Sequence, residues 1–531
     1  MNRVLETETV TRKTESLGAT RLEENLAEME RNRERYWRRY PSTSPFKLRW
    51  RAIAVRHCFH VLPGETILEL GAGSGLWTKH LGEVLRGENP IVAATFNDGF
   101  SVTADRLPNV RLPNVRFRKI TTLEELPAES FDYVVGTAIL SHDMCARNLK
   151  AICRLLKPGG QILFFEENYW NPLAIVRSLL PGRLVGQASC HAAMRKYRLM
   201  RVASQQGFVD IDVIPYDIIH PLVLRLAIPA LRSLAFAIEH APLIRELCGT
   251  LYIRAQKPGS EEKRRPKGSL ANHRNLYGST SFVIPCHNEE MNIDRLVNSL
   301  VRFYGPYIHE IVIVNDNSTD RTAEVTREIA RHEPRVKLVD RTPPNGVGRA
   351  LRDGYAAATG RYIFTMDSDF VQILPEFRDL FDVIAGGGDG AIGSRFSHDS
   401  LLINYPFAKI FCNRSFHILA NLLLPIHVRD ISNNLKLYKA EILKNIEIEQ
   451  PHFAANVETG LKPLLAGYDV REVPISWIDR TIDMGSSSFR IAGVAPGYFR
   501  ALISIVWNSW RRGKGVDIRK QPSAAAARNA N

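Results

Sequence analysis

The sequence predicts an α/β protein with two domains in series, and three observations support this. The chain has 531 residues, more than one hydrophobic core usually supports, and 45% of them are hydrophobic. Residues 65–75 form an apolar run that ends in a glycine-rich turn, whereas residues 311–320 and 363–370 are apolar runs that end in acids. Between these strand ends, residues 256–277 are polar and basic, contain Pro and Gly, and lack an apolar period, which predicts a linker.

Domain boundaries follow from changes in composition. Residues 1–49 are charged, with a helical pattern over 22–39, so we expect a helical N-terminal extension. The first domain is predicted over 50–255 and the second over 278–490. Residues 491–531 end the chain with an amphipathic basic segment and an alanine-rich tail that we expect to be disordered.

The first domain is defined by the glycine-rich turn. An apolar strand leads into Gly71, Gly73 and Gly75, and residues 77–85 continue with helical periodicity. Glycines at such a turn let the backbone approach a ligand closely. Together with Glu69 and with the segments 130–135, 155–165 and 206–208, this pattern resembles the class I S-adenosylmethionine-dependent methyltransferases, which have a Rossmann-like fold. The resemblance implies S-adenosylmethionine as cofactor and places Glu69, Gly71, Gly73 and Gly75 at its binding site.

Other positions of this domain depart from the family pattern. The second strand, residues 92–98, lacks the usual acid for the ribose hydroxyls and leaves Asp98 as the candidate. Ile120-Thr-Thr122 replaces the usual Gly-Asp, so a divergent site and an inactive one both stay open. His142 is either a base near the methyl acceptor or a packing histidine, and Glu166-Glu-Asn168 either line the acceptor side or solvate a strand end.

The second domain carries acids at the ends of two predicted strands. Residues 311–314 and 362–366 read as buried parallel strands, and ligands bind beyond the carboxyl ends of such strands. Asp316 and Asp320 follow the first strand, and Asp367 and Asp369 follow the second. An Asp-x-Asp pair can offer two hard oxygen ligands to Mg²⁺, which prefers to share its shell with substrate phosphates. The sequence therefore predicts a nucleotide-sugar site with Mg²⁺ or Mn²⁺ against the diphosphate.

Four motifs in order resemble the family 2 glycosyltransferases, which have a GT-A fold, over residues 279–485. They are Phe282–Glu290, Asn315–Asp320, Asn345–Ala350 with Gly354 and Gly360, and Asp367–Asp369. Further matches narrow the resemblance to the dolichyl-phosphate mannose and polyprenyl-phosphate sugar synthases. These matches are Gly393–Arg395, Asp430–Ser432, Glu472–Ile475, Arg480 and Gly485–Phe489.

The resemblance implies roles for named residues. Asp367 and Asp369 hold the metal, and Arg395 and Arg480 bind phosphate, since the planar guanidinium suits phosphate oxygens. The nucleotide pocket is lined by Pro285, Asn288, Glu289, Asp316 and Asp320.

Three positions depart from this second family. Asn315 replaces the first acid of an Asp-Asp pair, which bears on base or ribose recognition. Val371 stands where Gln is common, with Gln372 one residue later, and Ser432-Asn-Asn434 replaces Ser-Gly-Phe on the acceptor side.

The acceptor decides the mechanism. A lipid phosphate is already anionic, so charge neutralisation rather than a strong base would dominate catalysis. A hydroxyl acceptor needs a base, and Glu458 is the available candidate, with a structural role left open. The Gln-x-x-Arg-Trp signature of processive synthases is absent from the sequence, which favours transfer of a single sugar, and the resemblance implies inversion.

Charge and hydropathy indicate the partners. A net charge of +14 favours anionic partners, but the aromatic and basic pattern of a nucleic-acid module is absent. The sequence has no apolar stretch of about 18 residues, no signal peptide and no metal spacing among its seven cysteines, so we expect a cytoplasmic protein. Amphipathic segments over 221–244, 401–424 and 498–514 either lie on a membrane or pack within their domains, and packing is favoured for the first. The last segment ends in a basic cluster beside tryptophans, so we expect peripheral contact with the cytoplasmic membrane face.

The combined interpretation is a bifunctional enzyme. The second domain transfers one sugar from a nucleoside diphosphate donor to a polyprenyl phosphate, and the first methylates an acceptor of the same pathway with S-adenosylmethionine. The alternative is a glycosyltransferase that acts on a hydroxyl of a cell-surface glycan, with the first domain a degenerate binding or scaffold module.

Overall fold

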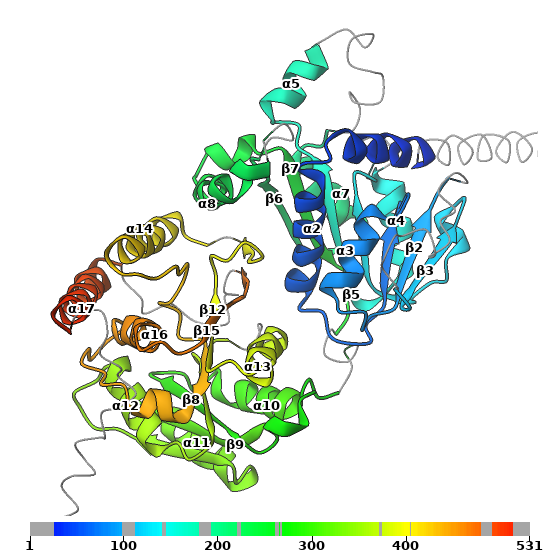
Figure 1. The fold of residues 1–531 in the computed structure, drawn as a ribbon. Helices are drawn as coiled ribbons and strands as arrows, with labels where there is room; N and C mark the ends of the chain where they lie inside the picture. Colours follow the sequence, from blue (N-terminus) through cyan, green and yellow to red (C-terminus); the bar gives the residue numbers. More distant parts are fainter. Residues whose placement is uncertain are drawn as a thin grey trace, which may run out of the picture. The chain divides into compact units, whose positions relative to one another are not determined.

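The computed structural model describes residues 26–97, 112–140, 145–179, 193–219, 223, 225–260, 265, 268–370, 374–403, 405–478 and 491–512. The chain divides into two compact units, Met1–Pro266 (unit 1) and Lys267–Asn531 (unit 2), each with its own mixed sheet (Figure 1). The prediction of two α/β domains in series is confirmed. None of the described helices is long and apolar enough to cross a membrane.

Unit 1 contains a seven-stranded sheet in the order β3-β2-β1-β4-β5-β7-β6. Strands β3 to β5 are parallel, and β7 is antiparallel to both β5 and β6. The strands are β1 (Ile67–Leu70), β2 (Ile91–Thr95), β3 (Val115–Lys119), β4 (Phe131–Thr137), β5 (Leu156–Glu167), β6 (Val209–Tyr216) and β7 (Thr250–Gln256). All residues of β1 and β4 are buried, as expected of central parallel strands that are covered on both faces.

Helices cover this sheet and complete unit 1. They are a helix over residues 26–39, α2 (Ser44–Phe59), α3 (Leu76–Val84), α4 (Cys145–Leu155), α5 (Pro172–Leu179), α7 (Lys196–Gln205) and α8 (Ile228–Ile238), with short 3-10 turns η3 (Leu123–Glu125), η5 (Arg225–Ala227) and η6 (Ile244–Leu247). The predicted boundary at residue 49 falls inside α2, where Leu48 and Trp50 are both buried. The described part of the N-terminal extension is thus an integral part of unit 1, because its apolar side chains enter the core.

Unit 2 contains a seven-stranded sheet in the order β10-β9-β8-β11-β14-β12-β15. The first four strands in this order are parallel, β14 is antiparallel to both neighbours, and β12 pairs in parallel with β15. The strands are β8 (Thr280–Cys286), β9 (Ile308–Asn315), β10 (Val336–Asp340), β11 (Tyr362–Thr365), β12 (Gly390–Ser394), β14 (Lys436–Lys439) and β15 (Val470–Pro474). A separate two-stranded ladder joins β13 (Leu402–Ile403) to β16 (Trp477–Ile478).

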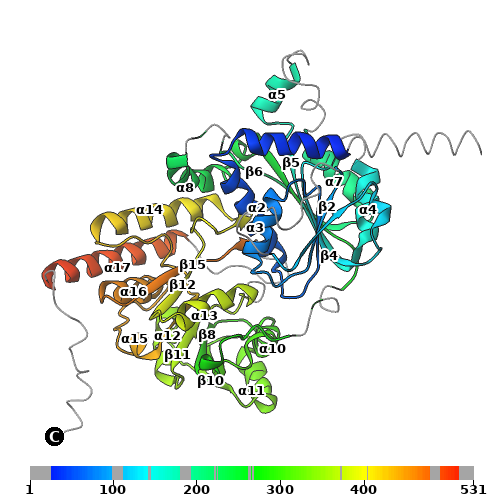
Figure 2. The same ribbon diagram turned by 45° about the vertical axis from the view of Figure 1, so that its right-hand side comes forward.

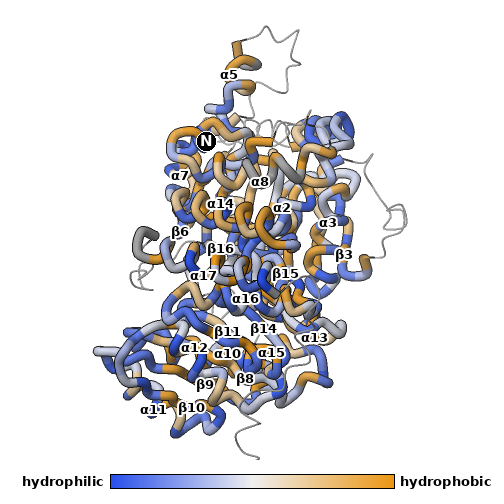
Figure 3. The backbone as a smooth tube through the Cα atoms, turned by 60° about the vertical axis from the view of Figure 1, so that its left-hand side comes forward, coloured by the Kyte–Doolittle hydropathy of each residue, from blue (hydrophilic) through white to orange (hydrophobic). Residues whose placement is uncertain are grey.

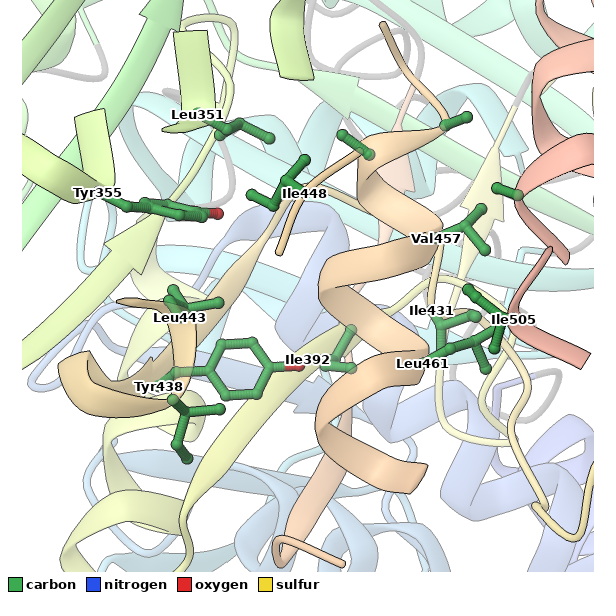
Figure 4. Packing of buried hydrophobic residues seen from close by; sticks show 14 of the residues in the cluster. Leu351, Tyr355, Ile392, Ile431, Tyr438, Leu443, Ile448, Val457, Leu461 and Ile505 are labelled. Atoms are coloured by element: carbon green, nitrogen blue, oxygen red, sulfur yellow. The ribbon is translucent and has the colours of Figure 1, made fainter. Parts of the chain in front are cut away.

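The helices of unit 2 pack on both the sheet and one another. They are α10 (Ile293–Tyr304), α11 (Thr322–His332), α12 (Val347–Ala357), α13 (Arg378–Ala385), α14 (Phe407–Leu423), α15 (Ala440–Lys444), α16 (Ala455–Leu465) and α17 (Ile491–Arg512), with η7 (Arg274–Leu276) and η8 (Leu374–Phe377). Figure 4 shows Val457 and Leu461 of α16 beside Ile431 and Ile505, so α16 lies between the sheet side and α17.

Described residues at both ends of the predicted linker belong to the two units. β7 extends to Gln256, and Leu270 and Leu276 are buried within unit 2. The backbone N of Leu270 also donates to the carbonyl of Phe303 at 2.7 Å. Burial of Leu270 and Leu276, together with this hydrogen bond, joins the end of the predicted linker to unit 2.

Candidate active sites

The acids and amides predicted for the sugar site meet at one edge of the unit 2 sheet. Parallel strands β9, β8 and β11 are neighbours, so their carboxyl ends lie together. The polar segment after β8 contains Asn288 and Glu289, the segment after β9 contains Asp316 and Asp320, and Asp367 and Asp369 follow β11. Pro285 lies within β8, opposite Val314.

Asp316 connects the end of β9 to the start of α12. One carboxylate oxygen accepts from the backbone N of Gly346 at 2.7 Å, and the other pairs with the guanidinium of Arg341. The backbone N of Asp316 donates to the carbonyl of Cys286 at 2.8 Å. Both carboxylate oxygens are therefore engaged within the protein, and Asp316 holds the loop around the predicted nucleotide pocket in place.

Asn288 and Asp320 join the loops after β8 and β9. The side-chain oxygen of Asn288 accepts from the backbone N of Thr319 at 2.8 Å, and Asp320 accepts from the backbone N of Glu290 at 3.1 Å. Burial alone would raise the pKa of Asp320, but hydrogen bonds from Thr322 and the backbone lower it. Asp320 thus stays ionised and also binds the first residue of α11 through the Thr322 backbone N at 3.0 Å. Glu289 accepts from Asn292 at 2.7 Å in the same segment.

The structure gives a reason for Asn315, which departs from the family pattern. Its amide nitrogen donates to Asp340 at 2.7 Å, and its amide oxygen accepts from the backbone N of Ser318 at 3.2 Å. An aspartate could make the second contact but would repel Asp340, because a carboxylate accepts and does not donate. The partner of Asn315 lies on β10, a neighbour that local sequence does not reveal.

Asp367 and Asp369 form a half-buried pair directly after β11. The amide nitrogen of the buried Asn434 donates to Asp367 at 2.7 Å and so fixes the orientation of this carboxylate. Asn434 belongs to the segment that departs from the family on the acceptor side, and its contact with the predicted metal ligand was not foreseen.

Lys436 is a fully buried cation behind this pair, and the sequence analysis missed it. Its ammonium donates to the carbonyl of Asn456 and to the hydroxyl of Thr459, both at 2.6 Å. Burial lowers the pKa of Lys436 to about 7, although the carboxylates of Asp430 and Asp367 favour the charged form. In the sequence, only the position of this lysine between Leu435 and Leu437 could have indicated the group.

Arg395 lies at the end of β12 and is held by the buried Asp430. Arg395 Nε and Nη2 donate to the two carboxylate oxygens at 2.7 and 3.0 Å, and Nη1 donates to Tyr405 at 3.1 Å. Burial alone would raise the pKa of Asp430, but the Arg395 guanidinium lowers it to about 2. The guanidinium predicted to bind phosphate is therefore fixed in one orientation by an anion of the protein.

Glu458 has the contacts of a structural carboxylate. It is buried in α16 and accepts from the backbone N of Gln450 at 2.8 Å and from the Lys462 ammonium at 2.8 Å. A third contact, from the backbone N of Glu449, measures 3.3 Å. These contacts engage both oxygens and favour the structural alternative over a general base. Asp98, His142, Val371, Gln372 and Arg480 lie outside the described residues.

The three glycines of the unit 1 turn all have a left-handed backbone conformation. Gly71, Gly73 and Gly75 have φ of +70°, +56° and +81°, a region of backbone conformation that residues other than glycine rarely adopt. Glu69 is buried on β1 just before this turn, and burial raises its pKa to about 7. Among the described residues, no group hydrogen-bonds to its Oε2.

A second buried carboxylate, Glu166, lies at the end of β5. Its Oε1 accepts from the backbone N of Ile139 at 2.9 Å and of Leu140 at 3.0 Å. Burial raises the pKa of Glu166 to about 8. Asn168 donates instead to the carbonyls of Glu246 and Cys248, both at 2.8 Å, and so fastens a strand end.

Known families match separate parts of the chain. Residues 67–160, which begin with the first residue of β1, match a family described as a methyltransferase domain. Residues 281–447, which begin within β8, match the family described as glycosyl transferase family 2.

Among the described residues, no group of three or more His, Cys, Asp or Glu side chains could hold a metal ion.

Similar proteins of known name include two transferases. The polyprenol monophosphomannose synthase of Mycolicibacterium smegmatis is 28% identical over 221 residues, which are 39% of this chain and 81% of that protein. The dolichol-phosphate mannosyltransferase of Pyrococcus furiosus is 29% identical over 200 residues, which are 37% of this chain and 56% of that protein. The chain thus spans little more than half the length of the second relative.

Solved structures resemble each half of the chain. Glucosyl-3-phosphoglycerate synthase from Mycobacterium tuberculosis, in complex with Mn²⁺ and uridine-diphosphate-glucose, is 17% identical with a TM-score of 0.35, covering 45% of this chain and 84% of that chain. A methyltransferase from Thermotoga maritima, described as a possible histamine N-methyltransferase, is 18% identical with a TM-score of 0.31, covering 44% of this chain and 99% of that chain. The two family matches and the two relatives show that the protein is an enzyme with a methyltransferase domain followed by a glycosyltransferase family 2 domain, as the sequence predicts.

Proposed function

We propose that unit 2 transfers a single sugar from a nucleoside diphosphate donor to a polyprenyl phosphate, with inversion and with a divalent metal. The observation that carries the proposal is the pair Asp367 and Asp369 at the carboxyl end of β11, with Asp367 oriented by Asn434. The similarity to a polyprenol monophosphomannose synthase supports the choice of acceptor.

The donor set fits a hard divalent cation. Asp367 and Asp369 are separated by one residue, and the amide of Asn434 fixes the orientation of the first carboxylate. Such a pair suits Mg²⁺ or Mn²⁺, which take their remaining ligands from substrate phosphates and water. When bound, the ion neutralises charge on the diphosphate leaving group. Arg395 is the proposed second source of positive charge, and Asp430 keeps its guanidinium in a single orientation. Asn288, Glu289, Asp316 and Asp320 shape the proposed nucleotide pocket through the loop contacts described above.

A phosphate acceptor agrees with the state of Glu458. A phosphate oxygen is already anionic and needs no strong base, and both oxygens of Glu458, the base candidate from the sequence, are engaged within the protein. The alternative, transfer to a hydroxyl of a glycan, would require another base.

The proposal is tested by transfer from a panel of nucleotide sugars with Mg²⁺ or Mn²⁺, each with and without a short-chain polyprenyl phosphate. Product that forms only with the lipid phosphate would support the proposal and identify the donor. Transfer that is indifferent to the lipid phosphate would favour the glycan alternative. Asp369→Ala is expected to abolish transfer, whereas Glu328→Ala, an exposed acid of α11, should not alter it. Full activity of Asp369→Ala would refute the proposed metal site.

We further propose that unit 2 meets the membrane through α14 and α17. The two helices lie side by side, with the rings of Phe416 and Tyr498 at 5.5 Å (Figures 1 and 2). Figure 3 shows that hydrophobic residues dominate α14. Large apolar side chains nevertheless remain exposed on both helices: Phe407, Phe411, Ile418 and Leu422 on α14, and Phe499, Ile503, Trp507 and Trp510 on α17.

Exposed aromatic side chains beside basic ones suit an anionic membrane surface. Trp507 and Trp510 are 53% and 65% exposed, and the Arg511 guanidinium lies 4.7 Å from the Trp507 ring. The double variant Trp507→Ala/Trp510→Ala should lose cosedimentation with anionic vesicles. Tyr277→Ala, which removes an exposed aromatic outside these helices, is the matched control. Equal binding of both variants would contradict membrane contact through α17.

For unit 1, we propose S-adenosylmethionine-dependent methylation of an acceptor in the same pathway. The match to a methyltransferase family and the left-handed turn over Gly71, Gly73 and Gly75 support this. Glu69 is the proposed acidic residue of the site. Calorimetric titration with S-adenosylmethionine, followed by transfer of a labelled methyl group to the sugar product, tests the proposal. Absence of binding would favour the alternative of a degenerate scaffold.

A further inference from the structure

The helix over residues 26–39, drawn in dark blue without a label in Figure 1, contacts the glycine-rich turn of unit 1 through Glu30 and Gly73. Three charged side chains on one face of this helix, Glu30, Arg33 and Glu34, are buried, whereas Arg35 on the opposite side is exposed. Buried charges are costly unless they are paired or hydrogen-bonded, so their partners show what this face recognises.

Glu30 joins the glycine-rich turn to the end of β2. One carboxylate oxygen accepts from the backbone N of Gly73 at 2.9 Å. The other accepts from the backbone N of Phe96 and the Thr95 hydroxyl, both at 3.0 Å, and from the Asn97 amide at 2.6 Å. The carboxylate of Glu30 thus binds the backbone N–H groups of Gly73 and Phe96 at this end of the sheet.

Arg33 joins the same turn to the end of β4. Its guanidinium donates to the carbonyl of Thr137 at 2.8 Å and to the carbonyl of Gly71. Burial lowers the pKa of the Arg33 guanidinium, whereas nearby carboxylates, among them Glu69 and Glu166 of the site, favour its charged form. A Cβ atom on Gly71 would lie 2.9 Å from Arg33 Nη1, so Arg33 occupies the space that this glycine leaves open.

The chemistry of S-adenosylmethionine matches these contacts. The cofactor has an ammonium group and a sulfonium group that seek carbonyls and carboxylates, and a carboxylate and ribose hydroxyls that seek donors or acceptors on the backbone. In sheets of this kind, a ligand binds beyond the carboxyl ends of the central strands, at the glycine-rich turn. The groups available there are Gly71 O, Thr137 O, Gly73 N and Phe96 N, and all four are already bound by Arg33 or Glu30.

We propose that helix 26–39 is an internal ligand that occupies the cofactor pocket of unit 1, so that it must move away before S-adenosylmethionine binds. The inference rests on the cofactor proposed for unit 1. Methyl transfer is then autoinhibited in the described conformation, and whatever displaces the helix activates unit 1.

The first test measures S-adenosylmethionine affinity of the full chain by calorimetry. Arg33→Ala removes the cation that occupies the pocket. It should tighten binding roughly tenfold or more, because the helix then loses its charged hydrogen bonds to the carbonyls of Gly71 and Thr137. Arg35→Ala, on the exposed side of the same helix, should bind as the unaltered chain does. Weaker binding by Arg33→Ala, or affinity equal to that of Arg35→Ala, would overturn the inference.

The second test needs no substitution and therefore does not depend on how a variant folds. Amide hydrogen exchange across residues 26–39 should accelerate at least tenfold when the unaltered chain is saturated with S-adenosylmethionine. If S-adenosylmethionine binds and residues 26–39 exchange as slowly as without it, the inference is overturned, whereas the cofactor proposed for unit 1 stands. Absence of binding by the unaltered chain and both variants would instead refute the cofactor proposed for unit 1, and the inference with it.

Discussion

The pair between the buried Asp430 and Arg395, whose side chain is 14% exposed, predicts a large loss of stability for Asp430→Asn. Asp430 accepts three hydrogen bonds from Arg395, from the backbone N at 3.0 Å, Nε at 2.7 Å and Nη2 at 3.0 Å. Burial would raise the pKa of Asp430 above its ordinary 3.8, but the guanidinium lowers it to about 2. Since one pKa unit equals about 1.4 kcal/mol, the ionised pair stabilises unit 2 by roughly 2–3 kcal/mol at neutral pH.

Asparagine keeps the volume of Asp430 but leaves the Arg395 charge buried without its counterion. Removing one partner of a buried pair typically costs about 3–5 kcal/mol, so we expect a loss of about 3 kcal/mol in the free energy of unfolding of unit 2. Because the folded pKa is lowered, the stabilisation is present above pH 3.8 and is lost as the pH falls toward 2. The difference between the variant and the unaltered chain should therefore shrink at acidic pH.

Amide hydrogen exchange in β12 and β14, measured across a urea series, reports the stability of unit 2 separately from unit 1. Glu324→Gln is the control, because it removes a pair with Arg321 in which the side chains are 65% and 66% exposed. Such exposed pairs contribute little to stability, because solvent screens the two charges. A loss for Asp430→Asn no larger than that of the control would refute the reasoning.

Three further substitutions test other parts of the structure. Glu458→Gln should lower the stability of unit 2 by about 1–2 kcal/mol, because it weakens the contacts of Glu458 with Gln450 N and Lys462, and it should leave sugar transfer intact. A fall of about 100-fold in kcat at unchanged stability would instead support Glu458 as the general base. Gly354→Ala should cost about 1–3 kcal/mol in chemical unfolding, because the new Cβ would lie 2.5 Å from a methyl of β8, whereas Gly268→Ala meets open space and should cost little. Glu69 has a pKa of about 7 in the folded chain against an ordinary 4.5, so the unaltered chain should lose stability as the pH rises through this interval. Glu69→Gln should therefore flatten the pH dependence of the thermal stability of unit 1. An unchanged pH profile would contradict this expectation.

Local patterns in the sequence were sufficient for the architecture and for the strand ends. Apolar runs followed by a glycine-rich turn or by acids depend on residues that are close in the chain, and both sheets contain these strands as predicted. The order of the two families follows from the same motifs. Turn geometry and strand burial are local properties, so neighbouring residues suffice to predict them.

Only the tertiary structure decided which side chains meet. Asn434 reaches Asp367 from 67 positions away, and Asp430 holds Arg395 from 35 positions away. Glu30, which the sequence placed in a charged extension, is fully buried and binds Gly73, 43 positions later. No local periodicity encodes such pairs, because they depend on strand order and on which helix covers which strand end, and both are set when the cores form.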